Sequence, residues 1–377
     1  MKIAQVTKYF YPHHGGIETH VLGISKGLID RDIEVLVFTS NLPRSKKFEI
    51  LDGIQIYRSL SFFTLSNDPF APGILINLLK EEYDLIHLHL PDPFCSVFAF
   101  IASLIRRKPL IVTYHADIIR DQWYYRILNS VYEIFLFLIL KHSKRIIATS
   151  PNYVKESKTL KKFEEKIEVV PNFVDIEKFN PNVKEEIREK YNLKNKEVIL
   201  FLGRLVPYKG VEYLIKAFSN VKKEFRNSAL IIAGDGPLKE KLKEMAKEIP
   251  DVIFLNINEE KIPQYYAACD VFVLPSITRQ EAFGISLLEA MASGKPCIAT
   301  KISGMPYVIG KTGILVKPRD INSLSNAIIR LLQDKKLSEE LSKKARRRVE
   351  KEFTLERVTN ALFSIYCHAL RIYNRNG

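Results

Sequence analysis

The chain has 377 residues, of which 46% are hydrophobic and 27% are charged. This length exceeds that of one ordinary domain and suits two, and the composition excludes a disordered protein. The net charge of +14 indicates an anionic partner, for which nucleic acid, an anionic membrane surface and a phosphorylated small ligand all qualify. Most of the excess charge falls in residues 173–377.

Cysteine usage and hydropathy narrow the class of protein further. The four cysteines are scattered, without a CxxC or a Cys/His pair, which excludes a zinc ribbon or disulfide scaffold and favours a reducing compartment. The N-terminus lacks the apolar stretch of a secretory signal, and the apolar stretches 93–105 and 134–140 are shorter than the roughly 20 residues of a membrane-spanning helix. We therefore expect a cytoplasmic protein, with peripheral contact at the inner face of the cell membrane left open.

The first half of the chain has the alternation of strands and helices that is typical of a parallel α/β sheet. A strand at 3–7 leads into a loop with two adjacent glycines, Gly15 and Gly16, and then into a helix that ends near residue 28. Paired glycines allow a ligand to approach the backbone closely. Further strands are predicted at 33–39, 85–89, 110–114 and 145–149, with a long apolar helix that ends near residue 141.

The second half repeats this arrangement. A strand ends at Gly203, a loop follows over 204–210, and a helix is predicted over about 211–225. Further strands are predicted at 230–233, 252–255, 271–274, 297–300 and 313–316, before a helical tail. The fold class is therefore α/β, with two Rossmann-like doubly wound domains in tandem, and in each the loop after the first strand lies where such sheets bind ligands.

The loop after the first strand of the second domain suits a diphosphate. Arg204 follows the strand, and Lys209 precedes the next helix. A helix N-terminus offers unpaired N–H groups and a partial positive charge, and an Arg adds bidentate binding. The alternative is a solvated loop with two surface cations.

A second candidate site is the segment EAFGISLLEAMASGKP, which begins at Glu281. Ser286 and Glu289 have the spacing of a capping box, so Glu289 either caps its helix or binds a ligand. Carboxylates suit neighbouring sugar hydroxyls, because an ionised carboxylate accepts several hydrogen bonds. Glu281 and Glu289 are too far apart along the chain to lie side by side on a helix, so we expect them to contact different parts of one extended ligand.

Histidines mark the strand ends of the first domain. His115 follows a predicted strand, where it either reaches a ligand or packs. His87 and His89 alternate on another strand, but no third ligand has a convincing spacing, so we interpret the pair as structural rather than as a metal site. Gly234-Asp235-Gly236 is similar to a dinucleotide fingerprint but lacks its third glycine, so this match is weak.

A series of motifs runs along nearly the whole chain in this order: YFYPHHGGIETHV, LIHLHLP, TYHAD, IATSP, VVPNFVD, LGRLVPYKG, IAGDGPL, LPS and EAFGISLLEAMASGKP. With them the chain resembles the retaining, nucleotide-sugar-dependent glycosyltransferases of the GT-B fold, family GT4. The resemblance implies a hexosyltransferase built from two facing Rossmann-like domains across a cleft. Its acceptor domain would span 1–175, its donor domain 176–354, and its last helix, about 355–377, would return to the first domain.

The resemblance also assigns roles to residues. The donor diphosphate would be held by Arg204 and Lys209 with Gly15, Gly16 and Gly203, and the backbone of Phe283, Gly284 and Ile285 would complete its cradle. Glu281 would contact the transferred sugar, Glu289 the ribose hydroxyls, and His115 the far side of the sugar. The family works without a metal or other cofactor, so neither is expected. Tyr307 is a departure, because the family usually has Glu there, and we expect it to alter a helix entry or the acceptor wall.

Several alternatives stay open. GDP-mannose, UDP-glucose and UDP-N-acetylglucosamine all qualify as donor, and the acceptor is a glycan, a lipid-linked or a small-molecule hydroxyl. Another GT-B activity, such as a sugar-nucleotide epimerase, is the enzymatic alternative. A basic nucleic-acid-binding protein is the other, but Lys and Glu alternate along 239–248 as on a solvated helix face.

Contact with a membrane surface is compatible with a glycosyltransferase function. Basic residues follow both apolar stretches, at 106–108 and at 141–145. Of the two interpretations, we favour buried core helices whose basic C-termini match the helix dipole over an anionic membrane surface.

Overall fold

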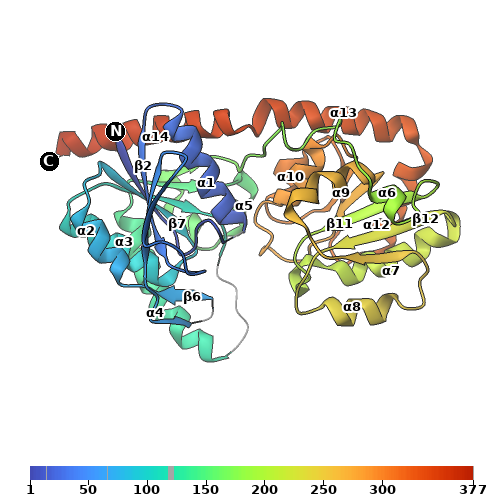
Figure 1. The fold of residues 1–377 in the computed structure, drawn as a ribbon, viewed down its shortest axis with the longest axis horizontal. Helices are drawn as coiled ribbons and strands as arrows, with labels where there is room; N and C mark the ends of the chain where they lie inside the picture. Colours follow the sequence, from blue (N-terminus) through green and yellow to red (C-terminus); the bar gives the residue numbers. More distant parts are fainter. Residues whose placement is uncertain (14, 66, 118–122, 377) are drawn as a thin grey trace. The chain divides into compact units, whose positions relative to one another are not determined.

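The computed structural model describes residues 1–13, 15–65, 67–117 and 123–376 (Figure 1). These residues form two compact units: unit 1 comprises residues 1–172 and 355–377, and unit 2 comprises residues 173–354. The first unit thus ends at residue 172, three residues before the boundary that was expected from the sequence, after residue 175. No helix among the described residues is both long and apolar enough to span a membrane.

Unit 1 is built on a sheet of eight strands in the order β10-β9-β8-β7-β1-β2-β4-β3. All neighbours are parallel except β3 and β4. The strands and the separate β5–β6 hairpin are β1 (Lys2–Val6), β2 (Glu34–Ser40), β3 (Phe48–Leu51), β4 (Ile54–Ser59), β5 (Phe63–Leu65), β6 (Asp68–Phe70), β7 (Leu85–Leu90), β8 (Leu110–Tyr114), β9 (Arg145–Ala148) and β10 (Ile167–Val169). The strands β3 to β6 were not predicted from the sequence.

Helices cover this sheet because its strands are apolar on both faces, as in other parallel sheets. They are α1 (Gly16–Ile29), α2 (Gly73–Lys80), α3 (Pro93–Ile105), α4 (Trp123–His142), α5 (Pro151–Glu156), the 3₁₀ helix η1 (Leu160–Lys166) and α14 (Leu355–Asn376). The C-terminal helix α14 packs on α1, where a Cβ added to Gly27 would lie 2.6 Å from the hydroxyl of Thr359. Arg31 of unit 1 also donates to the amide oxygen of Asn360 at 2.7 Å.

Unit 2 has a fully parallel sheet in the order β13-β12-β11-β14-β15-β16. Its strands are β11 (Glu197–Leu202), β12 (Ser228–Ala233), β13 (Val252–Leu255), β14 (Val271–Leu274), β15 (Cys297–Thr300) and β16 (Ile314–Val316), each within two residues of its prediction. The strand order reverses between β11 and β14. This is the topological switch point, at whose carboxyl edge open α/β sheets bind ligands.

The helices of unit 2 are α6 (Ile187–Lys190), α7 (Val211–Glu224), α8 (Lys239–Ala246), α9 (Ile262–Ala268), α10 (Ile285–Ala292), α11 (Met305–Ile309), α12 (Ile321–Gln333) and α13 (Lys335–Glu352), with the 3₁₀ helices η2 (Pro207–Lys209) and η3 (Glu259–Lys261). Tyr307 in α11 lies against Phe353, with ring centroids 6.0 Å apart. The Tyr307 side chain, at the position where the family usually has Glu, therefore makes a packing contact inside unit 2.

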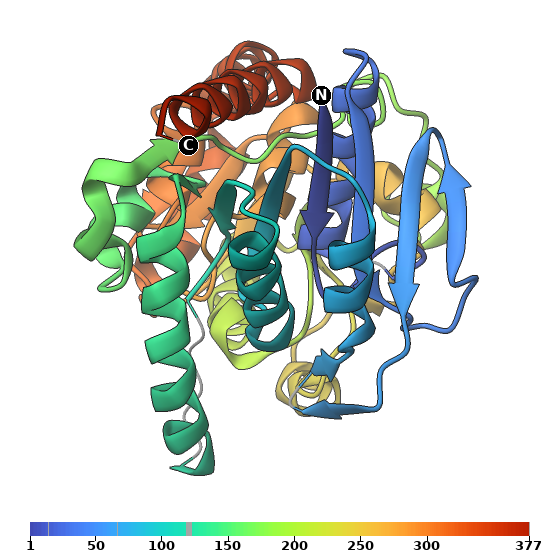
Figure 2. The same ribbon diagram turned by 90° about the vertical axis from the view of Figure 1, so that its left-hand side faces the viewer.

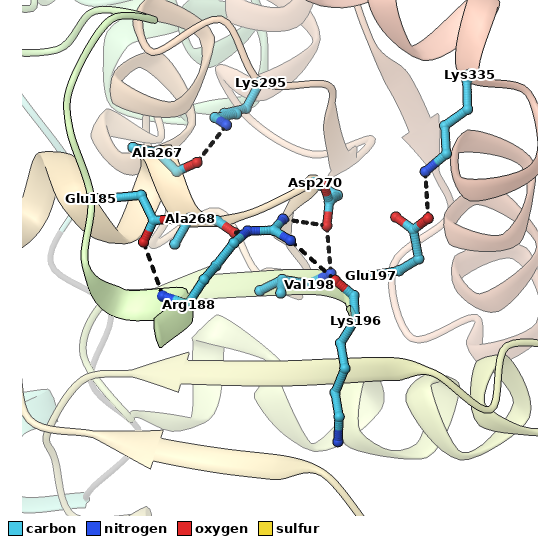
Figure 3. A network of polar contacts seen from close by, with 10 residues as sticks. All are labelled: Glu185, Arg188, Lys196, Glu197, Val198, Ala267, Ala268, Asp270, Lys295 and Lys335. Atoms are coloured by element: carbon cyan, nitrogen blue, oxygen red, sulfur yellow. Dashed lines mark hydrogen bonds and ion pairs between the residues drawn. The ribbon is translucent and has the colours of Figure 1, made fainter. Parts of the chain in front are cut away.

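An ion-pair network ties the start of unit 2 to the amino edge of its sheet (Figure 3). Arg188 in α6 pairs with Asp270 at 2.6 Å, and Asp270 also accepts a hydrogen bond from the backbone N–H of Val198. The network borders a surface hollow of about 460 Å³ whose basic lining includes Lys335, itself paired with Glu197 at 2.6 Å. Because these cations already have carboxylate partners, the hollow is best explained as part of this structural network.

Candidate active site

The switch point of unit 2 holds a buried ion pair. Lys209 Nζ lies 2.6 Å from Glu281 Oε2, and the two side chains are 11% and 9% exposed. Ser276 donates its hydroxyl to the same oxygen at 2.9 Å. Burial by itself would lower the pKa of Lys209, but attraction by Glu281 and Tyr208 raises it above its ordinary value, so Lys209 is a cation at neutral pH.

A glycine explains how Lys209 reaches Glu281. Gly210 has a φ of 65°, and a Cβ at this position would lie 2.3 Å from the carbonyl oxygen of Pro275. The backbone N–H of Ile277 donates to the carbonyl of Tyr208 at 2.8 Å. The loop after β11 is thus pressed against the loop after β14, which only glycine permits here.

The Gly234-Asp235-Gly236 segment has a similar structural role. A Cβ at Gly234 would lie 2.0 Å from the carbonyl oxygen of Gly203, and one at Gly236 would lie 2.6 Å from that of Leu205. The two loops therefore pack backbone against backbone, joined by the hydrogen bond from the N–H of Leu205 to the carbonyl of Asp235 at 2.8 Å. This close approach accounts for the two glycines that were weakly similar to a dinucleotide fingerprint.

Arg204 lies near the Lys209–Glu281 ion pair, at an exposed position of the loop that carries Lys209. Its charge is close enough to oppose the protonation of Lys209, although Glu281 outweighs it. Gly203, which precedes it, has a φ of 153°, and the Lys209 Nζ would lie 3.7 Å from a Cβ there. The cation of Lys209 therefore lies over the end of β11, next to the exposed guanidinium.

The capping-box prediction for Ser286 and Glu289 is wrong. Helix α10 begins one residue after Gly284, whose φ of 85° makes it the N-cap, so Ser286 is already the second residue of the helix. Glu289 instead accepts a hydrogen bond from the hydroxyl of Tyr266 at 2.7 Å. The N–H groups of Leu287 and Leu288 donate to the carbonyl of Gly284, and the N-terminus of α10, which begins at Ile285 after the buried Phe283, is the kind of helix end that suits an anion.

Burial raises the pKa of Glu289 to about 7, well above its ordinary value of 4.5. Between these two pH values the folded protein holds a proton that the unfolded chain lacks, so this group's contribution to stability falls as the pH rises from 4.5 to 7. The resemblance assigns ribose hydroxyls to this carboxylate, and hydroxyls donate to its ionised form, so we expect nucleotide affinity to change in the opposite sense.

We therefore expect nucleoside diphosphate affinity to rise about tenfold between pH 6 and pH 8, the change that ionisation of one such group produces. Calorimetric titration over this range measures it. In Glu289→Gln the rise should shrink to the part contributed by the nucleotide's own phosphate. An equal rise in both proteins would contradict the role of Glu289.

The remaining predicted residues belong to unit 1. Gly15 is the N-cap of α1 in extended conformation, and Gly16 is the first residue of that helix. The carboxylate of Glu18 occupies the space beside Gly15, so a Cβ added to Gly15 would lie only 2.3 Å from Glu18 Oε2. His115 follows β8 and is 8% exposed.

His115 lies in a cluster of histidines. Its Nε2 is 3.1 Å from Nδ1 of His89, and its ring meets that of His20 edge to face, with centroids 5.0 Å apart. The ligand atoms of these three residues lie within 4.8 Å of one another, so His89 does have further potential ligands, contrary to the sequence interpretation. His87, in contrast, is structural, with hydrogen bonds to Tyr366 and Thr113.

The cluster has the donor set of a Zn²⁺ site, because three buried neutral imidazoles suit that ion. Burial lowers the pKa of all three, to about 4 for His20 and well below the ordinary value for His89 and His115. The direct contact between His89 and His115, however, already engages one ring nitrogen of each of these two residues. A hydrogen-bonded cluster explains this geometry without an ion.

Five residues at the two sites had no predicted binding role: Ser276 and Tyr266 beside the two glutamates, and Gln5, His20 and His89 in or beside the histidine cluster. Three of them gave a signal, because Ser276 and His20 lie within the motifs LPS and YFYPHHGGIETHV and His89 alternates with His87 on a strand. Tyr266 and Gln5 lie on elements distant in sequence from Glu289 and His89, so no spacing rule connects them with the predicted residues.

Comparison with known proteins places both halves of the chain in one class. Residues 14–178 match the family described as Glycosyltransferase Family 4, and residues 183–348 match the family described as Glycosyl transferases group 1. The chain is 28% identical to O-antigen chain mannosyltransferase C of Escherichia coli, over 97% of this chain and 98% of that protein. It is 26% identical to N-acetyl-alpha-D-glucosaminyl L-malate synthase of Bacillus anthracis, over 97% of each.

Solved structures share the fold. A sucrose-phosphate synthase from Thermosynechococcus elongatus matches with a TM-score of 0.82 and 23% identity, over 98% of this chain and 99% of that one. Anabaena HepE in complex with UDP and glucose matches with a TM-score of 0.77 and 23% identity, over 97% and 99%. The chain belongs to the GT4-type glycosyltransferases and has the GT-B fold. It is a transferase that uses a nucleotide-sugar donor.

Proposed function

We propose that this enzyme transfers a hexosyl group, with retention of configuration and without a metal, from a nucleotide sugar bound on unit 2 to a hydroxyl acceptor. The observation that carries the proposal is the buried Lys209–Glu281 pair at the switch point of the unit 2 sheet. There a charged lysine lies beside a helix N-terminus, the surroundings that a diphosphate requires. Unit 1 would bind the acceptor, and the resemblance also gives Gly15, Gly16 and His115 a part in binding the donor.

The residues divide the chemistry between them. The bond between the anomeric carbon and the diphosphate oxygen breaks, and Lys209 and Arg204 stabilise the negative charge that develops on the departing phosphate. Glu281 uses its carboxylate to accept hydrogen bonds from sugar hydroxyls and so orients the ring. The acceptor oxygen bonds to the same face of the anomeric carbon, and its proton passes to the leaving phosphate oxygen.

Two cations and the start of a helix replace the divalent ion that neutralises a leaving diphosphate in other transferases. We therefore expect EDTA to leave the turnover rate unchanged and added Mg²⁺ or Mn²⁺ to leave it within about twofold. A rate that falls on chelation and returns with one metal would contradict metal independence, and would turn attention to the histidine cluster.

The donor is best identified by ligand-induced stabilisation. GDP-mannose, UDP-glucose and UDP-N-acetylglucosamine all remain candidates, and the mannosyltransferase relative makes GDP-mannose the first to test. A ligand at a hundred times its Kd adds about 2.7 kcal/mol of stability, so thermal unfolding with UDP, GDP and ADP should single out one base. Nucleotide release that depends strictly on an acceptor then excludes an epimerase, and release without any acceptor would contradict transfer.

The outer face of α4 supports a further part of the proposal, contact between unit 1 and an anionic membrane that carries a lipid-linked acceptor. Ile134, Phe135, Phe137 and Leu138 are all exposed on α4, and Ile134 is 63% exposed. The preference for a fully buried core helix is therefore wrong for this face. Figure 2 shows α4 extending beyond the strands of unit 1. Lys141 follows the apolar face, and such a combination of apolar and basic side chains suits an anionic bilayer surface.

Vesicle sedimentation tests this contact. We expect binding to phosphatidylserine-containing vesicles at low salt, weaker binding at high salt, and at least a tenfold loss of affinity in Ile134→Glu/Phe137→Glu. Ile76→Glu is the matched control, because Ile76 is an equally apolar side chain of α2 that is 53% exposed. Absence of binding by the unaltered protein at low salt would end the membrane proposal.

A further inference from the structure

A line of buried polar side chains crosses the sheet of unit 1 and ends at His115. Nε2 of His89 lies 2.7 Å from the amide oxygen of Gln5, and Nδ1 of His89 lies 3.1 Å from Nε2 of His115. Gln5 is in β1 and His89 is in β7, and both are completely buried. The three groups form one chain of hydrogen bonds with His115 at its outer end.

The chemistry of these groups fixes the direction of each hydrogen bond. An amide oxygen only accepts, so His89 must carry its proton on Nε2. Burial lowers the pKa of His89 and of His115 well below the ordinary value, so each ring is neutral and has a single N–H. Nδ1 of His89 is therefore an acceptor, and His115 donates to it from Nε2.

The other side of Gln5 lies toward a second polar group. Burial raises the pKa of Tyr366, and the side-chain amide of Gln5 offsets part of that rise. Among the described residues the amide nitrogen of Gln5 makes no hydrogen bond, whereas its oxygen is the atom that lies 2.7 Å from Nε2 of His89. The hydroxyl of Tyr366 lies 2.7 Å from Nδ1 of His87, and Nε2 of His87 lies 2.7 Å from the hydroxyl of Thr113.

We propose that Gln5 and His89 are positioning residues that hold His115 in the Nε2-protonated tautomer, so that its Nδ1 accepts a hydrogen bond from a hydroxyl of the transferred sugar. The inference rests on the proposed function, in which His115 faces the donor sugar. A site built to accept one hydroxyl proton discriminates strongly against a donor that lacks that hydroxyl, because the buried acceptor is then left unpaired. The contact would therefore contribute to the choice of sugar.

The packing of the ring adds to this control. His20 from α1 meets the ring of His115 edge to face at 5.0 Å between centroids, while His89 stacks with it at 5.4 Å. Contacts on two sides together with the hydrogen bond at Nε2 define both the ring plane and the tautomer. His115 is thus preorganised before any donor binds, which lowers the reorganisation required in the transition state.

The first test is spectroscopic and does not depend on activity. Long-range ¹H–¹⁵N correlation spectra of the histidine-labelled protein distinguish protonated from unprotonated ring nitrogens, and His115→Gln assigns the signal among the eight histidines. We expect a protonated Nε2 and an unprotonated Nδ1 at neutral pH. In His89→Leu the signal should move toward a mixture of tautomers. A protonated Nδ1 in the unaltered protein would overturn the proposal.

The second test uses a pair of matched variants. His87 and His89 are both completely buried on β7, but only His89 contacts His115. We expect His89→Leu to lower kcat at least tenfold and His87→Leu to lower it less than threefold, although both should reduce the thermal unfolding temperature. His89→Asn should retain most of the rate, because its side-chain oxygen lies where Nδ1 was and accepts from His115.

Deoxygenated donors connect the tautomer with the sugar. Removing one hydroxyl at a time should identify one donor whose penalty is large in the unaltered enzyme and small in His115→Ala and His89→Leu. Equal kcat losses in His87→Leu and His89→Leu would show a structural effect only and overturn the positioning role. If His115→Ala transfers sugar at the normal rate, the proposed sugar contact fails, whereas the tautomer assignment stands or falls by the spectra alone.

Discussion

Lys209→Ala is expected to lower the transfer rate by at least about a hundredfold, the scale on which one preorganised charge contact stabilises a transition state. The reason is the position of the ammonium group at the end of β11, where it is buried, held by Glu281 at 2.6 Å and charged at neutral pH. Arg204 is the other cation on the described loop, but its exposed guanidinium does not occupy the buried position of the ammonium group. Steady-state kinetics with a saturating acceptor measure the loss.

Lys216→Ala is the control for this variant. Lys216 is exposed on α7, the helix that follows the same loop, so its removal changes the net charge equally without touching the ion pair. We expect its turnover to stay within twofold of the unaltered enzyme. Near-normal turnover in Lys209→Ala would contradict the assignment of the diphosphate site to this loop.

Glu281→Gln should reduce the rate by a similar factor for a different reason. The amide keeps the size of the side chain and can still accept from Ser276, but it loses the charge that holds Lys209 and orients the sugar. A buried lysine without its counter-charge also destabilises the fold, by roughly 3 kcal/mol. We therefore expect both a slower enzyme and a lower free energy of unfolding, measured by kinetics and by urea denaturation.

A double variant separates these two effects. In Lys209→Met/Glu281→Gln neither charge remains, so most of the lost stability should return while the rate stays at least about a hundredfold low. Glu224→Gln, at an exposed position near the end of α7, should change neither quantity. Recovery of activity together with stability would mean that the pair is structural and not part of the donor site.

The sequence predicted the elements of unit 2 well because they are regular. Each strand is a short apolar run between polar helices, and all six occur within two residues of the prediction. The prediction was poorer in unit 1, where β3 and β4 form an antiparallel pair at the sheet edge. β3 has only four residues and is half exposed, so it lacks the continuous apolar run that marks a buried strand.

The outer face of α4 shows a second limit of sequence patterns. Apolar residues occupy every position from Ile134 to Leu140, so no periodicity distinguishes the buried face from the exposed one. The structure buries Leu136, Ile139 and Leu140 and leaves the other side chains in this stretch exposed. Which side packs is decided by the neighbouring elements and not by the helix itself.

By itself, the sequence determined that the protein has two doubly wound domains, which loops follow the first strands, and which residue types there suit a diphosphate and sugar hydroxyls. These properties depend on local hydrophobic pattern and on residue chemistry. Only the tertiary structure decided that Lys209 contacts Glu281 and that Gly284 rather than Ser286 caps α10. It also decided that His89 contacts His115. The physical reason is that parallel strands adjacent in a sheet are separated by whole helices in the chain, so contacts at the sheet edge carry no signature in sequence spacing.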